Sequence, residues 1–131
     1  MKIFEVFKNM FNVSLNEMAQ NTPKRTGLAS PIWIGKIGGQ HGPRIKVSND
    51  YHWYNTNNSF VVTISKNPRV VSGTCKLDND ELQDIFEWVI LNYDILYKIY
   101  NAIETGQQII EYNNQKFDVF HAFKYLTKKL I

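Results

Sequence analysis

Three histidines and one cysteine are the residues of this chain best suited to acid–base or nucleophilic chemistry. They are His41, His52, His121 and Cys75. A histidine titrates near neutral pH and can therefore act as a general acid or base. No two of these histidines have the spacing of metal ligands, and the sequence holds no second cysteine. We therefore expect no metal, no cofactor and no enzymatic activity. An enzyme using His41, which lies in a glycine-rich turn, is the least favoured alternative.

A group of carboxylates near the middle of the chain could be mistaken for a metal site. Its members are Asp78, Asp80, Glu81, Asp84 and Glu87. They fall in the first turns of a predicted helix, where the helix macrodipole favours negative charge. They lack the ligand spacing and the central glycine of a calcium-binding loop. We interpret them as the start of a helix.

Positive charge is concentrated between Asn21 and Lys76. This stretch holds eight Lys or Arg residues and one acid, Asp50, whereas the formal net charge of the whole chain is +3. From Leu77 onward the chain is net acidic. Such asymmetry indicates a cationic surface that meets an anionic or acidic partner.

The centre of the basic stretch is a glycine-rich turn followed by a predicted strand, from Arg44 to Val47. Alternation places Ile45 and Val47 on one face of this strand, and Arg44 and Lys46 on the other. These cations and the amides of the turn could bind phosphate, although no Gly-Lys-Ser/Thr motif follows the glycines. The alternative is that they are solvent-facing residues that keep sheet edges from pairing.

Aromatic residues follow this strand directly. Tyr51, Trp53 and Tyr54 lie on no periodic face, and together with Trp33 they could stack on bases or contact a protein. Packing in the core is the alternative. The residues predicted to bind a ligand or partner are Lys36, His41, Arg44, Lys46, Tyr51, Trp53, Lys66 and Arg69.

The elements that must position these residues form one α+β domain over residues 1–131. We predict a helix within the first twenty residues, a loop from Asn21 to Gly27, and a small antiparallel sheet of about four strands. The predicted strands are residues 31–37, 44–47, 59–65 and 70–76. A long helix from Asp78 to Asn101 packs across the sheet, starting with a capping box formed by Asp78 and Glu81. A last helix buries Val119, Ala122, Phe123, Leu126 and Leu130.

The long helix is apolar on more than one side. Its second stripe comprises Trp88, Leu91, Ile95 and Ile99. This stripe needs a second cover, which could be a terminal helix or another copy of the chain in a homo-oligomer.

The sequence also predicts a location. No apolar run approaches the roughly 20 residues of a membrane span. The N-terminus has charges within its apolar run and no small-residue cleavage site, so we expect no signal peptide. The single Cys75 fits a reducing compartment. We expect a cytoplasmic protein that does not bind membranes.

Two segments resemble a family of small phage and bacterial proteins, the one catalogued as domain of unknown function 4160. One is the turn and strand from His41 to Val47, and the other is the acidic helix start from Leu77 to Trp88. The resemblance covers about residues 41–101. It implies an α+β fold and a phage or mobile-element accessory protein that acts in a host cytoplasm.

These observations together predict a small non-enzymatic binding protein. It would inhibit or occupy a host protein through a basic, aromatic-containing sheet face. The alternative is a nucleic-acid or nucleotide-binding protein that uses the same face, with Arg44 and Lys46 on phosphate and Trp53 or Tyr54 on a base.

Overall fold

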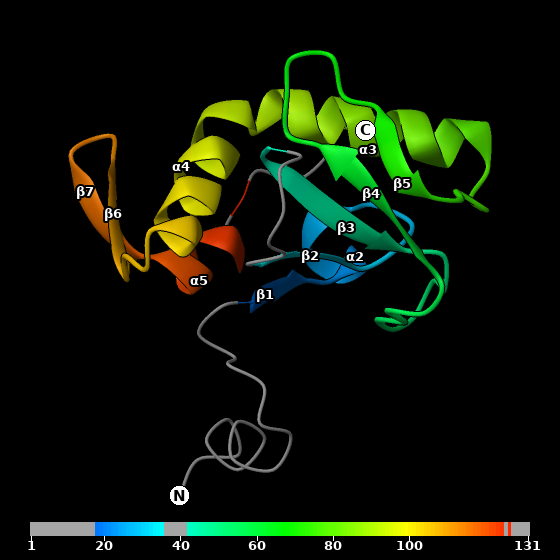
Figure 1. Cartoon of the computed structure of the whole chain (residues 1–131), viewed down its shortest axis with the longest axis horizontal. Coiled ribbons are helices and arrows are strands. Elements are labelled where there is room, and N and C mark those ends of the chain that lie inside the picture. The colour runs from blue at the N-terminus through cyan, green and yellow to red at the C-terminus, as the bar shows by residue number, and fades with distance from the viewer. Residues whose placement is uncertain (1–17, 36–41, 125, 127–131) are drawn as a thin grey trace, which may run out of the picture.

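The described residues have an α+β fold, as predicted (Figure 1). The structure is a computed structural model and describes residues 18–35, 42–124 and 126. Its main sheet has five antiparallel strands in the order β1-β2-β3-β4-β5, so each strand pairs with its neighbour in the chain. The strands are β1 (Met18–Asn21), β2 (Ile32–Gly35), β3 (Arg44–Ser48), β4 (Ser59–Thr63) and β5 (Val70–Gly73). The four predicted strands are confirmed, within a few residues at their ends.

The fifth strand, β1, corrects the sequence prediction at the N-terminus. Residues 18–20 were expected to be helical, but β1 pairs along its whole length with β2, from Met18 opposite Gly35 to Asn21 opposite Ile32. Pairing with β2 satisfies the backbone N–H and C=O groups of these residues. The pairing therefore overrides the local propensity, which favoured a helix. The rest of that predicted helix lies outside the described residues.

The predicted loop from Asn21 to Gly27 contains a short helix, α2 (Pro23–Thr26). Pro23 begins it, a position where the missing N–H of proline costs nothing. Gly27 ends it with φ of 77° and donates its N–H to the Pro23 carbonyl oxygen at 2.8 Å.

The predicted long helix is in fact two helices, α3 (Asn79–Leu91) and α4 (Tyr93–Glu104). Asn92 lies between them and is almost fully buried. Its side-chain Nδ2 donates to the Trp88 carbonyl oxygen at 3.0 Å, and its own carbonyl accepts the N–H of Leu96. The chain therefore changes direction at this residue (Figure 1). The capping box at the start of α3 is confirmed, with the Asp78 N–H donating to Glu81 Oε1 at 3.0 Å.

A hairpin that the sequence analysis did not predict follows α4. It consists of β6 (Ile109–Tyr112) and β7 (Gln115–Asp118). Asn113 and Asn114 connect the strands with φ of 52° and 63°. Two consecutive positive φ angles are typical of a type I′ turn, and asparagine tolerates them better than most residues. The last helix, α5 (Val119–Lys124), begins directly after β7.

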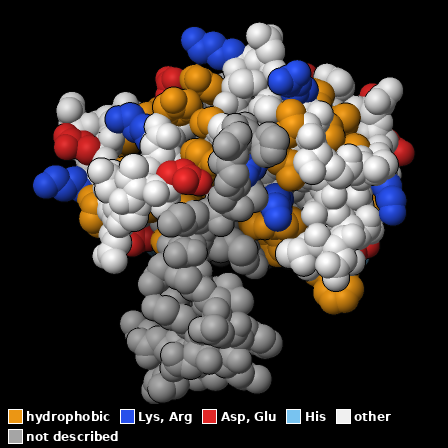
Figure 2. Space-filling view, in the orientation of Figure 1, with side chains coloured by type: hydrophobic (Ala, Val, Ile, Leu, Met, Phe, Trp, Pro, Cys, Tyr) orange, Lys and Arg blue, Asp and Glu red, His pale blue; other side chains and the backbone are white. Residues whose placement is uncertain are grey.

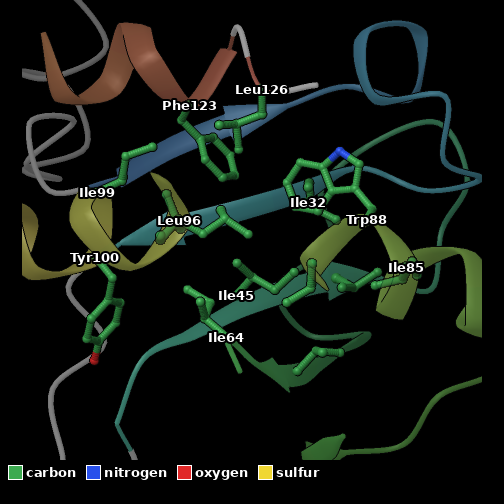
Figure 3. Packing of buried hydrophobic residues seen from close by; sticks show 14 of the residues in the cluster. Ile32, Ile45, Ile64, Ile85, Trp88, Leu96, Ile99, Tyr100, Phe123 and Leu126 are labelled. Atoms are coloured by element: carbon green, nitrogen blue, oxygen red, sulfur yellow. The ribbon is translucent and has the colours of Figure 1, made fainter. Parts of the chain in front are cut away.

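The core lies between the sheet and the helices (Figure 3). Ile32 and Ile45 approach it from the sheet, and Trp88 and Leu96 approach it from α3 and α4. Phe123 of α5 meets the Trp88 ring edge-on, with 6.3 Å between the ring centroids. The helix α5 therefore covers part of the second apolar stripe of the predicted helix. Leu91 of that stripe remains 49% exposed.

Candidate binding surface

The connection between β3 and β4, residues 49–58, is held by buried side chains; we call it the aromatic loop. Ser48, at the end of β3, is fully buried. Its hydroxyl donates to the Trp53 carbonyl oxygen at 2.9 Å and accepts the backbone N–H groups of Asp50 and Asn55 at 3.0 and 3.4 Å. One donated and two accepted bonds use the full capacity of a serine hydroxyl.

Asn49 ties the same loop to the segment after β5. Its Nδ2 donates to Asn58 Oδ1 at 3.1 Å and to the Thr74 carbonyl oxygen at 2.9 Å. Its Oδ1 accepts the backbone N–H of Lys76 at 2.7 Å. Within the loop, Asn55 Nδ2 donates to Asp50 Oδ2 at 2.7 Å. The loop is thus fixed by side-chain hydrogen bonds at both of its ends.

Two aromatic side chains of this ordered loop face solvent. Trp53 is 67% exposed and Tyr51 is 42% exposed. Figure 2 shows a hydrophobic side chain projecting at the lower right, where the aromatic loop lies in Figure 1. A tryptophan is highly buried on average, so strong exposure on a fixed backbone marks a candidate contact site.

Tyr51 also connects the aromatic loop to the start of α3. Its hydroxyl donates to Glu81 Oε1 at 3.0 Å. This hydrogen bond is the largest of the effects that raise the pKa of Tyr51, followed by burial and by the negative charge of Glu81. The carboxylate that completes the capping box of α3 therefore also orients an exposed tyrosine.

Tyr54 and Trp33 do not share this exposure. Their rings meet edge-on with centroids 5.0 Å apart, and the Tyr54 hydroxyl donates to the Ile32 carbonyl oxygen. Trp33 is only 3% exposed. Burial therefore excludes Trp33 from stacking on a base, and the half-buried Tyr54 ring packs against it.

Arg44 is also buried, at 3% exposure, which corrects the expectation of a solvent-facing strand residue. Its Nη1 donates to the Gly42 carbonyl oxygen at 3.0 Å, and its charge lowers the pKa of Tyr100. Burial of the Tyr100 hydroxyl and the charge of Glu104 outweigh this effect, so the pKa of Tyr100 is raised overall. Alternation placed Arg44 on the correct face, but it did not reveal that this face is covered.

The other predicted cations lie in different places. Lys46 is half-buried, opposite Trp33 on one side and Val61 on the other. Lys66 and Arg69 are exposed in the turn between β4 and β5. Lys36 and His41 lie outside the described residues.

The strand order separates the exposed candidates into two groups. The aromatic loop precedes β4, whereas the turn with Lys66 and Arg69 follows it. Five residues of strand at about 3.3 Å each place the two connections roughly 16 Å apart. Figure 2 shows Lys and Arg side chains dispersed over the visible face. Tyr51 and Trp53 share the connection before β4, whereas Lys66 and Arg69 lie in the turn after it.

Lys76 belongs to the aromatic end of the sheet and is missing from the predicted site. It is exposed, and its backbone is hydrogen-bonded to Asn49. The only feature of the sequence that could have pointed to Lys76 was its position at the end of the basic stretch. The return of β5 toward the aromatic loop, which only the sheet topology reveals, brings it there.

Groups suited to catalysis are dispersed in the part of the chain that the structure describes. His52 and His121 are exposed, and the Cys75 sulfur lies 3.9 Å from the Leu77 carbonyl oxygen. Within residues 18–35, 42–124 and 126, no three His, Cys, Asp or Glu side chains gather as a metal site would require. Among the described helices, none combines the length and the apolarity needed to cross a membrane.

Comparison of the chain with protein-family models, with curated proteins and with solved structures finds no match. The resemblance to the phage and bacterial family stays a prediction. Function must therefore be argued from the geometry of the surface.

Proposed function

We propose that this chain is a non-enzymatic binding protein that attaches to another protein through the aromatic loop. Trp53 would insert into an apolar pocket of the partner, with Tyr51 beside it in the loop and Lys76 at the same end of the sheet. The observation that carries the proposal is the 67% exposure of Trp53 on a backbone that a buried serine holds in place.

Tryptophan and tyrosine supply much of the affinity in protein interfaces. They bury a large area, and truncating one at the centre of an interface commonly costs about 2 kcal/mol or more. The fixed backbone adds to this effect, because a loop that is already ordered loses little conformational entropy on binding. Both properties occur in the aromatic loop.

The same observations favour a protein over a nucleic acid. Of the rings considered for base stacking, Tyr54 and Trp33 pack against each other. Arg44 is buried, and the exposed Lys66 and Arg69 lie at the opposite end of β4. A nucleic-acid site needs cations and stacking rings along one path.

The phage or mobile-element setting rests on the resemblance over residues 41–101. In that setting the partner is a protein of the bacterial host, and the chain acts by occupying it in the host cytoplasm.

Capture from host lysate tests this function when three baits are compared. The baits are the wild-type chain, Trp53→Ala and Tyr97→Ala. Tyr97 is a matched control because it is 41% exposed but lies on α4, outside the aromatic loop. The lysate is treated with nuclease before capture. We expect the wild-type and Tyr97→Ala baits to retain the same protein, and the Trp53→Ala bait to lose it.

Two results would contradict the proposal. One is retention of the same protein by the Trp53→Ala bait. The other is binding that disappears with nuclease and falls steeply with salt, because release of counterions from phosphates gives that dependence. The second result would favour the nucleic-acid alternative.

A further inference from the structure

A groove of about 650 Å³ lies at the junction of α3 and α4, away from the aromatic loop. One wall is the helix junction itself, with Ile90, Leu91 and Tyr93. The β6–β7 hairpin also lines the groove, with residues that include Asn113 and Phe117. Small-molecule sites in proteins commonly have volumes of roughly 300–1,000 Å³.

The groove is formed in advance by contacts that do not depend on a ligand. The buried Asn92 sets the direction change between the two helices. The Lys98 ammonium donates to the Glu111 carbonyl oxygen at 3.1 Å, which fixes the hairpin to α4. The buried Ile110 side chain anchors β6 to the core. At the base of the hairpin, the Val119 N–H donates to the Gln108 carbonyl oxygen at 2.9 Å.

The apolar part of the groove is incompletely covered. Ile90 and Leu91 are each 49% exposed, although they are adjacent on one helix and border the same groove. Phe117 and Leu126 also line the groove, and the first is half-buried while the second is buried. An apolar group placed there would remove this surface from water, at about 25 cal/mol per Å² buried.

The rim supplies a cation. The Lys66 ammonium lies 5.7 Å from the centroid of the Tyr93 ring, and both residues line the groove. The lining also contains one carboxylate, that of Asp94. Side-chain amides of Asn113 and Gln115 add hydrogen-bonding groups from the hairpin. Apolar walls with a few polar groups at the rim are typical of a small-ligand site.

We propose that this groove binds a small amphipathic anion, in which a carboxylate or sulfonate is attached to an aromatic or branched apolar group. The apolar group packs between Leu91 and Phe117, and the anionic group interacts with Lys66. This site is independent of the aromatic loop, which lies at the other end of β4 from Lys66.

A pair of naphthalene probes tests the proposal. The anionic probe is 1-anilinonaphthalene-8-sulfonate, and the uncharged probe is N-phenyl-1-naphthylamine, which has the same aromatic rings. The variants are Lys66→Gln, Leu91→Gln and, as a matched control, Arg69→Gln. Arg69 is an exposed cation of the same turn that does not line the groove. All three side chains are exposed, so the fold should tolerate these changes.

We expect saturable binding of the sulfonate at one site. Lys66→Gln should weaken it about three- to tenfold, as expected for loss of one partly screened charge, and change binding of the uncharged probe less than about twofold. Leu91→Gln should weaken both probes, and Arg69→Gln should change neither. Amide resonances of residues 112–115 should shift with the sulfonate, which locates the site.

Three results would overturn the proposal. The first is the absence of saturable sulfonate binding, and the second is binding that neither variant weakens. The third is binding that only Leu91→Gln weakens, because the groove would then lack the proposed preference for an anion.

Discussion

The buried hydroxyl of Ser48 donates a 2.9 Å hydrogen bond to the carbonyl oxygen of Trp53, the most exposed of the large hydrophobic residues in the described chain. The same hydroxyl oxygen accepts the N–H groups of Asp50 and Asn55. One side chain at the end of β3 therefore fixes the backbone from which the indole projects. Affinity that depends on Trp53 should also depend on Ser48, which does not need to touch the partner.

Ser48→Ala should loosen the aromatic loop and destabilise the fold. It removes the partner of one carbonyl and two N–H groups, so we expect the free energy of unfolding to fall by about 1–3 kcal/mol. Hydrogen exchange of the Asp50 and Asn55 amides should accelerate. Ser59→Ala is the matched control, because Ser59 faces Ser48 across the β3–β4 pair but makes one exposed hydrogen bond, to Thr56. Equal exchange rates in the two variants would contradict this role of Ser48.

Gly73→Ala should destabilise the sheet more than Gly106→Ala. Both glycines have φ near +75°, so both substitutions carry the cost of a left-handed alanine, about 1–2 kcal/mol. A Cβ at Gly73 would also lie 2.5 Å from the Ser59 carbonyl oxygen, whereas a Cβ at Gly106 meets nothing within 4 Å. We expect Gly73→Ala to cost a further 1–3 kcal/mol, roughly, in urea unfolding. Equal losses would show that β5 does not approach β4 in this way.

Tyr51 should titrate above its ordinary pKa of 10.0 because its hydroxyl donates to Glu81. The folded state holds the phenolic proton more tightly than the unfolded state does. This contribution to stability is therefore complete below pH 10 and is lost as the pH rises through the folded-state pKa.

Carbon NMR of the tyrosine ring measures this titration. Glu81→Gln should lower the pKa of Tyr51 toward 10.0, because a neutral amide replaces the carboxylate. Glu87 is an exposed acid further along α3, and Glu87→Gln should leave the pKa of Tyr51 unchanged. An identical Tyr51 titration in wild type and Glu81→Gln would exclude the contact.

Much of the fold could be predicted because the signals were local. Alternation of basic and apolar residues identified β3, and the capping box identified the start of α3. The change of direction at Asn92 could not be predicted in this way. The apolar pattern continues through that position, and the burial of a single amide group against Trp88 becomes evident only in the packed structure.

The candidate site was predicted in part. Tyr51 and Trp53 stood out because they lie on no periodic face, and both are exposed. The exposure of Arg44 was wrongly predicted, because alternation tells which face a side chain is on but not what covers that face. The separation of Trp53 from Lys66 follows from the meander order: successive connections lie at opposite ends of an antiparallel sheet. Proximity in sequence was therefore a poor guide to proximity in space.

The most direct test of the central claim is the affinity of the captured partner, after purification, for the wild-type chain and for Trp53→Ala. Isothermal calorimetry should show a loss of about 30-fold or more with Trp53→Ala, which corresponds to about 2 kcal/mol. The melting temperature should change little, because the side chain is 67% exposed. Tyr97→Ala should bind within about twofold of the wild type. Equal affinity of Trp53→Ala and the wild type would contradict the claim that the aromatic loop is the binding surface.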